Sequence, residues 1–515
     1  MTHLRAGFLP SIKLDPAAST PLRRQLYEWF RRAIADGRLK SGQRVPSSRG
    51  LAEELKVSRL TVVSAYEQLE AEGYLQTFRG AGTCIAASIP ELLRRGGAGT
   101  GRAERRARGT QRTAKRAKQL LSMPEEPQQA IAGPFRVSLP ALDHFLRRAW
   151  SRLISRHARS ASIKDMAYGD PMGEPGFRAA IAEYLGAVRG VRCDASQIMV
   201  TSGSQQAVQI TLRALLDPGD PVWVEEPGYS GTHRALVGSG CEPVPVPVDD
   251  EGLIVEEGIR RRPSARAAYV TPSHQYPLGM TLSAGRRIQL LNWAQSADAW
   301  IIEDDYDSEY RFGTEPITSL QGLDADDRVI YIGTFSKVLF PALRMGYLVL
   351  PKDLIQTFRV VRDAVDIFPP VLYQRALTDF IRDGGFARHI RKMRALYAAR
   401  RERMIAAIER YFGSDVDIAS AAAGLHLVIR LPRSIDDRAA TARAAAAGIA
   451  CTAFSVCCLS PPQRGGLILG YGGVATGSID ESVRKLARAV LREKPAATSG
   501  AMTETQWHPR VRAIR

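Results

Sequence analysis

The sequence predicts two folded domains of different classes: a small helical domain with a β-wing, followed by a larger α/β domain. At 515 residues the chain is too long for one ordinary domain. Residues 15–87 contain short helical patterns separated by turns. Residues 134–495 alternate apolar, strand-like runs with amphipathic helical patterns, which is typical of an α/β domain.

The two domains are separated by residues 88–133, which are rich in Gly, Ala, Arg and Lys. Residues 94–118 carry ten Arg or Lys against one Glu, with no aromatic residue. Such a segment cannot bury enough apolar surface to offset its ordering entropy. We therefore predict a basic, flexible linker in which the alanines permit transient helix. It is either a simple tether or an arm that adds nonspecific DNA contacts. Residues 496–515 are predicted to be a polar tail.

The composition is that of a soluble globular protein, with 45% hydrophobic and 24% charged residues. The net charge of +18 indicates either an Arg-rich solvated surface or a polyanionic partner. No apolar run approaches the roughly 20 residues that span a bilayer, and the N-terminus lacks an apolar signal region. The six cysteines form no C-x-x-C pair and accompany no His cluster. We therefore expect a cytoplasmic protein with reduced thiols, no metal site and no membrane contact.

The first domain shows the element order of a winged helix-turn-helix. Apolar residues at i, i+3 and i+4 spacing predict one helix over residues 22–34, which ends at Gly37. A second, short helix is expected from about Ser48. The third follows in "SRLTVVSAYEQLEAEGYL", with Val62, Tyr66 and Leu69 on its buried side. "YLQTFRGAGTCIA" then reads as two short strands around glycines.

The third helix begins with small polar residues, which suit the major groove of DNA. Arg79, beside glycines at the tip of the wing, could reach a phosphate or the minor groove. Two other interpretations stay open from the pattern alone. The domain could be an ordinary helical domain with a hairpin, or a winged helix used for protein contacts.

Two turns of the larger domain could contact a phosphorylated, planar ligand. In "QIMVTSGSQQAVQITLRALL" a strand turns into a helix, and the free N–H groups of a helix N-terminus favour a phosphate. Ser204 and Gln205 would be its first contacts, although Gly-Ser turns begin many helices. "PVWVEEPGYSG" places Tyr229 at the carboxyl end of a strand, where its ring can stack on a planar group. An ordinary core or surface tyrosine is the alternative.

The stretch "WIIEDDYDSEYRF" carries four acids directly after a buried strand. Asp304 could hold the ring nitrogen of a pyridine protonated, which makes the ring an electron sink. Tyr306 could hydrogen-bond a phenolic oxygen of the same ring. The alternatives are a metal ligand set and a solvated acidic loop.

A lysine follows the apolar strand in "VIYIGTFSKVLFPALRMGY". Burial and the nearby charge of Arg344 should lower the amine pKa of Lys337, which could then form a Schiff base with an aldehyde. Thr334, Ser336 and Arg344 can donate hydrogen bonds to a phosphate. Phosphate turn, stacking ring, ring-nitrogen acid and Schiff-base lysine together fit one cofactor, pyridoxal 5'-phosphate.

Resemblance to known families adds to this interpretation. The run "PSSRGLAEELKVSRLTVVSAYEQLEAEGYLQTFRGAGTCIA" resembles the GntR-type winged-helix domain. The resemblance implies DNA contacts at six positions: Arg49, Ser58, Arg59, Thr61, Arg79 and Gly80. Leu60 and Ser64 depart from the usual residue types, so the resemblance does not predict the operator sequence.

The larger domain resembles the fold-type I aminotransferases from "YGDPMGEPGFRAAIAEYL" to "GLILGYGG". With the winged helix before it, and with "TPSHQYPLG" and "IIEDDYDSEYR", the chain resembles the MocR family of bacterial regulators. That resemblance implies a homodimer that binds a double-stranded DNA operator and responds to pyridoxal phosphate or to a small amine or amino acid.

The alternative is a working aminotransferase that carries a DNA-binding domain. Aminotransferases commonly grip the substrate carboxylate with a C-terminal arginine, but Ile468 stands at that place here. Arg430 is the other arginine nearby, and strand alternation would turn its apolar neighbours, rather than Arg430, toward the site. We expect no physiological turnover and at most a residual half-reaction.

Overall fold

The computed structural model describes residues 11–78, 82–87, 113–124, 133–312, 317–419 and 423–491. The chain divides into two compact units, residues 1–112 and residues 113–515. Within the described ranges, every helix is too short or too polar to cross a membrane.

The first unit is a winged helix-turn-helix, as the sequence predicts. Its core joins the three helices through buried side chains that include Leu26, Phe30, Val62 and Leu69. The side chain of Ser47 caps the second helix by accepting a hydrogen bond from the backbone N–H of Gly50. The elements are α1 (Leu22–Ala35), α2 (Ser48–Leu55), α3 (Arg59–Ala71) and the antiparallel pair β1 (Leu75–Phe78) and β2 (Gly82–Ile85).

The second unit contains an eight-stranded mixed sheet with the order β3-β10-β9-β8-β7-β4-β5-β6. The strands from β9 through β8, β7 and β4 to β5 are parallel, whereas β10 runs antiparallel to both β3 and β9. The strands are β3 (Ile198–Thr201), β4 (Pro221–Glu226), β5 (Glu242–Asp249), β6 (Gly252–Leu253), β7 (Ala267–Val270), β8 (Trp300–Asp305), β9 (Val329–Thr334) and β10 (Gly346–Val349).

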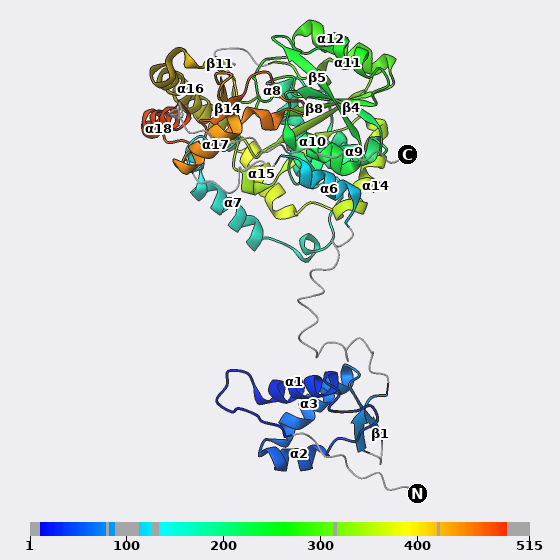
Figure 1. The fold of residues 1–515 in the computed structure, drawn as a ribbon. Helices are drawn as coiled ribbons and strands as arrows, with labels where there is room; N and C mark the ends of the chain where they lie inside the picture. The colour runs from blue at the N-terminus through cyan, green and yellow to red at the C-terminus, as the bar shows by residue number, and fades with distance from the viewer. Residues whose placement is uncertain are drawn as a thin grey trace, which may run out of the picture. The chain divides into compact units, whose positions relative to one another are not determined.

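Helices cover both faces of this sheet (Figure 1). Helices α9 (Ser204–Leu215), α10 (Ser230–Ser239) and α14 (Ile355–Asp366) pack on the face that carries Ile302 and Ile332. Helices α11 (Val255–Arg261) and α12 (Ala284–Ser296) pack on the face that carries Ile301 and Trp223. Helices α8 (Pro175–Arg189) and α15 (Val371–Arg382) cover the antiparallel end, and α7 (Arg147–Arg159) packs against them. The short helix α13 (Leu320–Leu323) buries Leu320 in the same core as α12.

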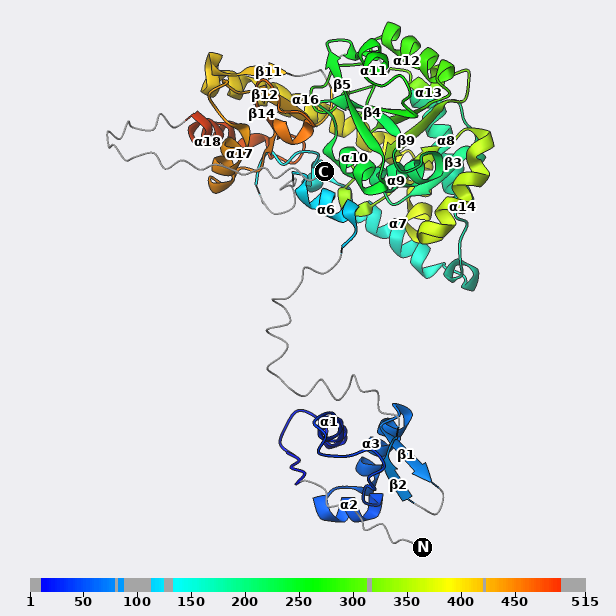
Figure 2. The ribbon, with the colours of Figure 1, turned by 45° about the vertical axis from the view of Figure 1, so that its right-hand side comes forward.

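A smaller lobe of the same unit is built on a four-stranded antiparallel sheet with the order β11-β12-β14-β13 (Figure 2). Its strands are β11 (Asp417–Ala419), β12 (His426–Arg430), β13 (Thr452–Ala453) and β14 (Gly466–Gly470). Helices α16 (Gly385–Phe412), α17 (Asp437–Ala446) and α18 (Ile479–Leu491) bury its outer face.

The structure departs from the sequence prediction within residues 88–133, the expected linker. Helix α6 (Lys115–Ser122) lies against α10: Arg116 donates to the carbonyl of Gly238 at 3.4 Å, and Leu120 lies beside the same glycine. Further on, a bridge links Phe135 to Gly470 of β14. A few apolar contacts are enough to order a short alanine-containing basic segment once a partner surface is present, and composition does not reveal such a partner. Residues 88–112 and 496–515 lie outside the described residues.

Candidate functional site

Strand β8 ends in three consecutive acids, and strand alternation sends them to opposite faces of the sheet. Asp305 points away from α9 and α10. Its carboxylate forms a buried ion pair with Arg189 at 2.8 Å and accepts the hydroxyl of Tyr331 at 2.5 Å. Glu303 lies on that same face and accepts two backbone N–H groups at the start of α13. The carboxylates of Asp305 and Glu303 are thus both hydrogen-bonded to other groups of the protein.

Asp304 lies on the opposite face and is almost fully buried. Its Oδ2 accepts the hydroxyl of Tyr269, whereas its Oδ1 is buried without a hydrogen-bond partner among the described residues. Burial raises the pKa of the Asp304 carboxyl to about 6, and the hydrogen bond from Tyr269 opposes that rise. A buried carboxylate oxygen of this kind needs an N–H or O–H donor, so Asp304 is suited to a ligand with one.

Lys337 follows β9 and lies where the large sheet meets the smaller lobe. Its Nζ is 3.5 Å from the carbonyl oxygen of Ser138. Ser138 belongs to the segment that Phe135 attaches to β14 at Gly470. The charge of Lys337 lowers the pKa of Asp304, which indicates that the amine and the carboxyl share one region of the site.

The N-terminus of α9 meets Arg344 in a close contact. Gly203, the residue before α9, has a φ of +92°, and a Cβ there would lie 3.3 Å from three atoms of the Arg344 guanidinium. The backbone conformation therefore favours glycine, and a Cβ here would also crowd the guanidinium. Gly346 in β10 lies behind this turn, close to Gly203 and Gly333. The N–H groups at the start of α9 and the Arg344 guanidinium thus lie side by side, and together they favour the binding of an anion at this turn.

The other predicted phosphate contacts surround this turn. Ser204 begins α9, and the Gln205 amide donates to the carbonyl of Gly231 at 2.9 Å. The Thr334 hydroxyl donates to the Met345 carbonyl at 3.4 Å and accepts the N–H of Ser336 at 3.2 Å. A cavity of about 260 Å³ opens here between Gln205 and Arg344.

Tyr229 lies directly before α10, at the carboxyl end of β4, as the sequence predicts. Its half-buried ring meets Tyr276 edge-on, with 5.7 Å between the ring centroids. A Cβ at position 231 would lie 2.5 Å from the Tyr229 ring, so Gly231 is needed for this ring position. The ring thus has a fixed position at the strand edge.

Tyr306 lies in a buried network that the sequence reasoning did not assign. Its hydroxyl is 2.9 Å from both the Nδ1 and the carbonyl oxygen of His274, and His274 Nδ1 is also 3.0 Å from Asp307 Oδ1. The Asp307 carboxylate is therefore paired with His274, as the Asp305 carboxylate is paired with Arg189. The phrase "TPSHQYPLG" contains His274, but spacing alone did not indicate its contact with Tyr306.

His426, another residue without a predicted role, begins β12 beside His274, with 5.4 Å between the ring centroids. Its Nε2 is 2.9 Å from the carbonyl oxygen of Pro277. Burial lowers the pKa of His426 to about 4, so the ring is neutral near pH 7. The tilted pair of histidine rings connects the smaller lobe to the large sheet.

Residues His426, Val428 and Arg430 alternate along β12 and share one face, whereas Leu427 and Ile429 face the core of the smaller lobe. The expectation that the apolar neighbours of Arg430 would face the site is therefore wrong for Leu427 and Ile429. Ile468 on β14 pairs with Val428 and is fully buried in a cluster that includes Tyr229 and Tyr306. An isoleucine at this place cannot bind a carboxylate.

In the first unit, the predicted DNA contacts lie at the start of α2 and α3. Arg49 and Arg59 are exposed, and Thr61 is partly exposed. Ser58 caps α3 by accepting the N–H of Leu60 at 3.2 Å. Leu60 is 74% exposed, an apolar residue in a polar position. Arg79 and Gly80 lie outside the described residues.

Among the residues that the structure describes, no group of three or more His, Cys, Asp or Glu is placed to hold a metal ion.

Comparison with known proteins identifies both units. Residues 22–85 match the model described as bacterial regulatory proteins, gntR family, and residues 143–466 match aminotransferase class I and II. The chain is 40% identical to the probable rhizopine catabolism regulatory protein MocR of Rhizobium meliloti, over 93% of this chain and 95% of the relative. It is 33% identical to the pyridoxine biosynthesis transcriptional regulator PdxR of Corynebacterium glutamicum, over 90% and 94%.

Solved structures resemble the second unit. The kynurenine aminotransferase of Pyrococcus horikoshii, in complex with PMP, superposes with a TM-score of 0.67 and 28% identity, covering 77% of this chain and 99% of the other. The α-aminoadipate aminotransferase LysN of Thermus thermophilus superposes with a TM-score of 0.65 and 26% identity, covering 74% and 95%.

Proposed function

Because this chain belongs to the MocR-type regulators, in which a GntR winged helix precedes an aminotransferase class I and II domain, we propose that it binds pyridoxal 5'-phosphate and that an amino compound alters its hold on DNA. The chain is a transcriptional regulator of this type, and its GntR unit implies DNA binding. The cofactor, the effector, the homodimer and a cytoplasmic location are parts of the proposal.

The unpartnered Oδ1 of Asp304 is the observation that carries the cofactor proposal. A pyridine nitrogen that is protonated offers the N–H donor that this buried oxygen lacks. The pairing would also supply a cation to a carboxyl whose pKa burial has raised. Asp305 and Asp307 already have protein partners, so Asp304 is the best-suited acid of this acidic stretch.

The remaining predicted contacts fit the same ligand. The turn at Gly203, the start of α9 and Arg344 would hold the phosphate, with Thr334 and Ser336 beside it. The ring of Tyr229 would lie against the pyridine. Tyr306, held by His274, would present its hydroxyl oxygen to the ring substituent.

Pyridoxal phosphate, when bound, supplies an aldehyde that an amine can capture reversibly. Lys337 is the residue of this chain that would hold the aldehyde carbon until an effector amine replaces it. Ile468 argues against efficient turnover of ordinary α-amino acids, because no arginine occupies that place to grip a carboxylate. The exchange of amines on the cofactor therefore serves to detect an amine rather than to turn it over. Detection changes transcription only if the ligand-free and ligand-bound proteins differ in their affinity for DNA.

One experiment tests this proposal directly. The protein is purified with pyridoxal phosphate, and its near-visible absorbance is recorded before and after reduction with borohydride. We expect mass spectrometry of peptides to find the reduced cofactor on Lys337, and Lys337→Ala to lose this adduct while keeping its fold by circular dichroism. An adduct retained by Lys337→Ala, or found on another lysine, would contradict the assignment.

A further inference from the structure

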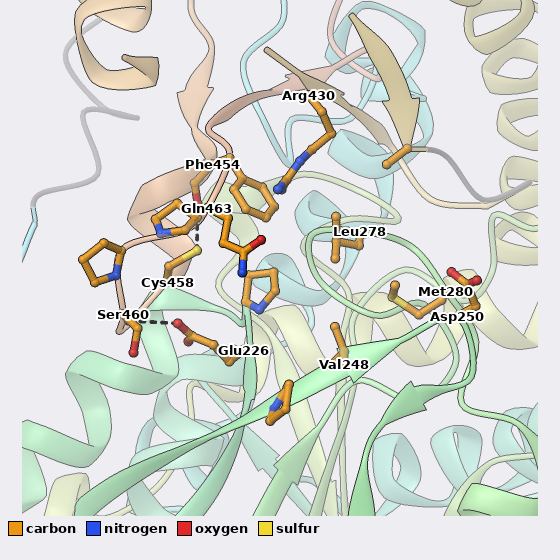
Figure 3. Close-up of a pocket in the computed structure, with 15 residues that line it drawn as sticks. Glu226, Val248, Asp250, Leu278, Met280, Arg430, Phe454, Cys458, Ser460 and Gln463 are labelled. Carbon is orange, nitrogen blue, oxygen red and sulfur yellow. Dashed lines mark hydrogen bonds between the residues drawn. The ribbon is translucent and has the colours of Figure 1, made fainter. Parts of the chain in front are cut away.

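A cavity of about 800 Å³ opens where the smaller lobe meets the carboxyl ends of β4 and β5, outside the predicted cofactor contacts (Figure 3). This volume lies in the range of small-molecule sites. One wall is apolar and includes Val248, Leu278 and Met280. The opposite wall holds Arg430, Phe454 and Gln463.

Arg430 is the cationic group of this cavity. Its guanidinium lies over the ring of Phe454, with the carbon 3.9 Å from the ring centroid. The side chain is partly buried, and burial lowers the pKa of its guanidinium. Among the described residues, no carboxylate lies within ion-pair distance of Arg430. A half-buried, stacked arginine with no ion-paired carboxylate in the described part of the chain favours an anionic ligand that can accept its forked hydrogen bonds.

The other ionisable groups that line the cavity are Glu226, Cys458 and Asp250. The Glu226 carboxylate accepts the N–H groups of Leu459 and Ser460 at 3.0 and 2.9 Å, so it is held away from Arg430. Burial raises the pKa of the Cys458 thiol to about 12, which keeps it neutral. Asp250 is exposed to solvent at the rim of the cavity. Its charge is therefore screened far more than that of a buried group.

The cavity is separate from the predicted Schiff-base region. Lys337 lies near the segment attached at Gly470, which pairs with His426 at the start of β12. Arg430 lies at the other end of that strand, opposite Gly466, about 13 Å away at the usual rise per residue. Val428 and Ile468 are fully buried between the two ends, so they close the direct route along this face.

We propose that this cavity is a second ligand site, which binds the carboxylate of a small organic acid on Arg430 and the acid's apolar chain against Val248, Leu278 and Met280. The site neighbours the loop of Tyr229 through Pro227, which also lines the cavity. An occupied cavity would thereby contact the loop that holds the predicted stacking ring. The proposal does not depend on the cofactor.

The test uses the full-length protein and hexanoate as the probe, with isothermal titration calorimetry and ¹³C-methyl methionine spectra as two readouts. We expect hexanoate to bind and to shift the Met280 resonance, assigned through Met280→Leu, while the other nine methionines serve as internal references. Acetate should bind more weakly because it lacks the chain, and hexylamine should not bind because it lacks the anion.

Arg430→Gln should weaken hexanoate binding about tenfold or more, through loss of charge-assisted hydrogen bonds, and Arg430→Lys should weaken it less. The matched control is Arg410→Gln, which removes an exposed arginine that also lies over an aromatic ring, Tyr411, but outside the cavity. The proposal is overturned if hexanoate does not bind the wild type, if acetate binds equally well, or if folded Arg430→Gln binds as the wild type does.

Discussion

The hydroxyl of Tyr269 donates to one carboxylate oxygen of Asp304 and leaves the other oxygen buried without a partner among the described residues. The hydrogen bond from Tyr269 fixes the orientation of the Asp304 carboxylate, and so it also fixes the position of Oδ1. The protein thus carries a buried acceptor that is suited to a donor from a ligand.

We predict that Asp304→Asn loses pyridoxal phosphate faster on dialysis than the wild type, because the amide cannot stabilise a charged ring nitrogen. The retained cofactor is measured by its near-visible absorbance. Tyr269→Phe is the matched control: it removes the neighbouring hydrogen bond but keeps the carboxylate, and it should retain more cofactor than Asp304→Asn. Equal retention by wild type and Asp304→Asn would transfer the role to another group.

The raised pKa of Asp304 predicts a pH dependence of stability in the cofactor-free protein. The folded carboxyl has a pKa of about 6, above the unfolded value of about 3.9, so the folded state binds the proton more tightly. Its contribution is therefore most favourable below about pH 4, and it falls as the pH rises to about 6. The loss corresponds to about 3 kcal/mol for a fully buried group.

Urea unfolding of wild type and Asp304→Asn between pH 4 and pH 8 isolates this effect. The free energy of unfolding of the wild type, relative to the variant, should decrease between about pH 4 and pH 6 and stay level from there to pH 8. A difference between the two proteins that does not change with pH would show that the carboxyl does not titrate as predicted.

The buried ion pair of Arg189 and Asp305 should be essential for stability, because both side chains are about 2% exposed. Arg189→Met leaves the Asp305 charge without compensation and should cost about 3–5 kcal/mol in the free energy of unfolding. Arg260→Met is the control, because Arg260 pairs with Glu257 on the surface and is 67% exposed. It should cost far less, because water screens an exposed ion pair. Similar losses for the two variants would contradict the buried pair's importance.

The exposed Arg59 at the start of α3 should contact a DNA phosphate. Arg59→Ala should weaken binding to specific and random DNA alike, and should reduce the slope of log K against log salt by about 0.9. Fluorescence anisotropy of labelled operator DNA over a salt series gives this slope. Arg32→Ala is the control, because Arg32 is an exposed arginine on α1 that pairs with Glu28. An unchanged slope in Arg59→Ala would exclude the contact.

The sequence by itself determined the element order and the chemistry of single residues. The i, i+3, i+4 pattern of the first helix and the apolar runs before Asp304 and Lys337 result from local backbone periods, which can be read along the chain. The glycines at Gly37 and Gly203 follow from backbone conformations that other residues rarely adopt. These features depend on neighbours within a few residues.

Only the tertiary structure decided how distant residues are paired. Three acids lie within four positions at 304–307. Contacts from α8 and from His274 determine that, within the described ranges, Asp304 alone of the three has a buried oxygen without a partner. The packing of α6 on α10 and the unpaired Arg430 over Phe454 arise in the same way. Such pairings depend on where the chain returns in space, and the energy of a contact between residues hundreds of positions apart leaves no periodic signal in one sequence.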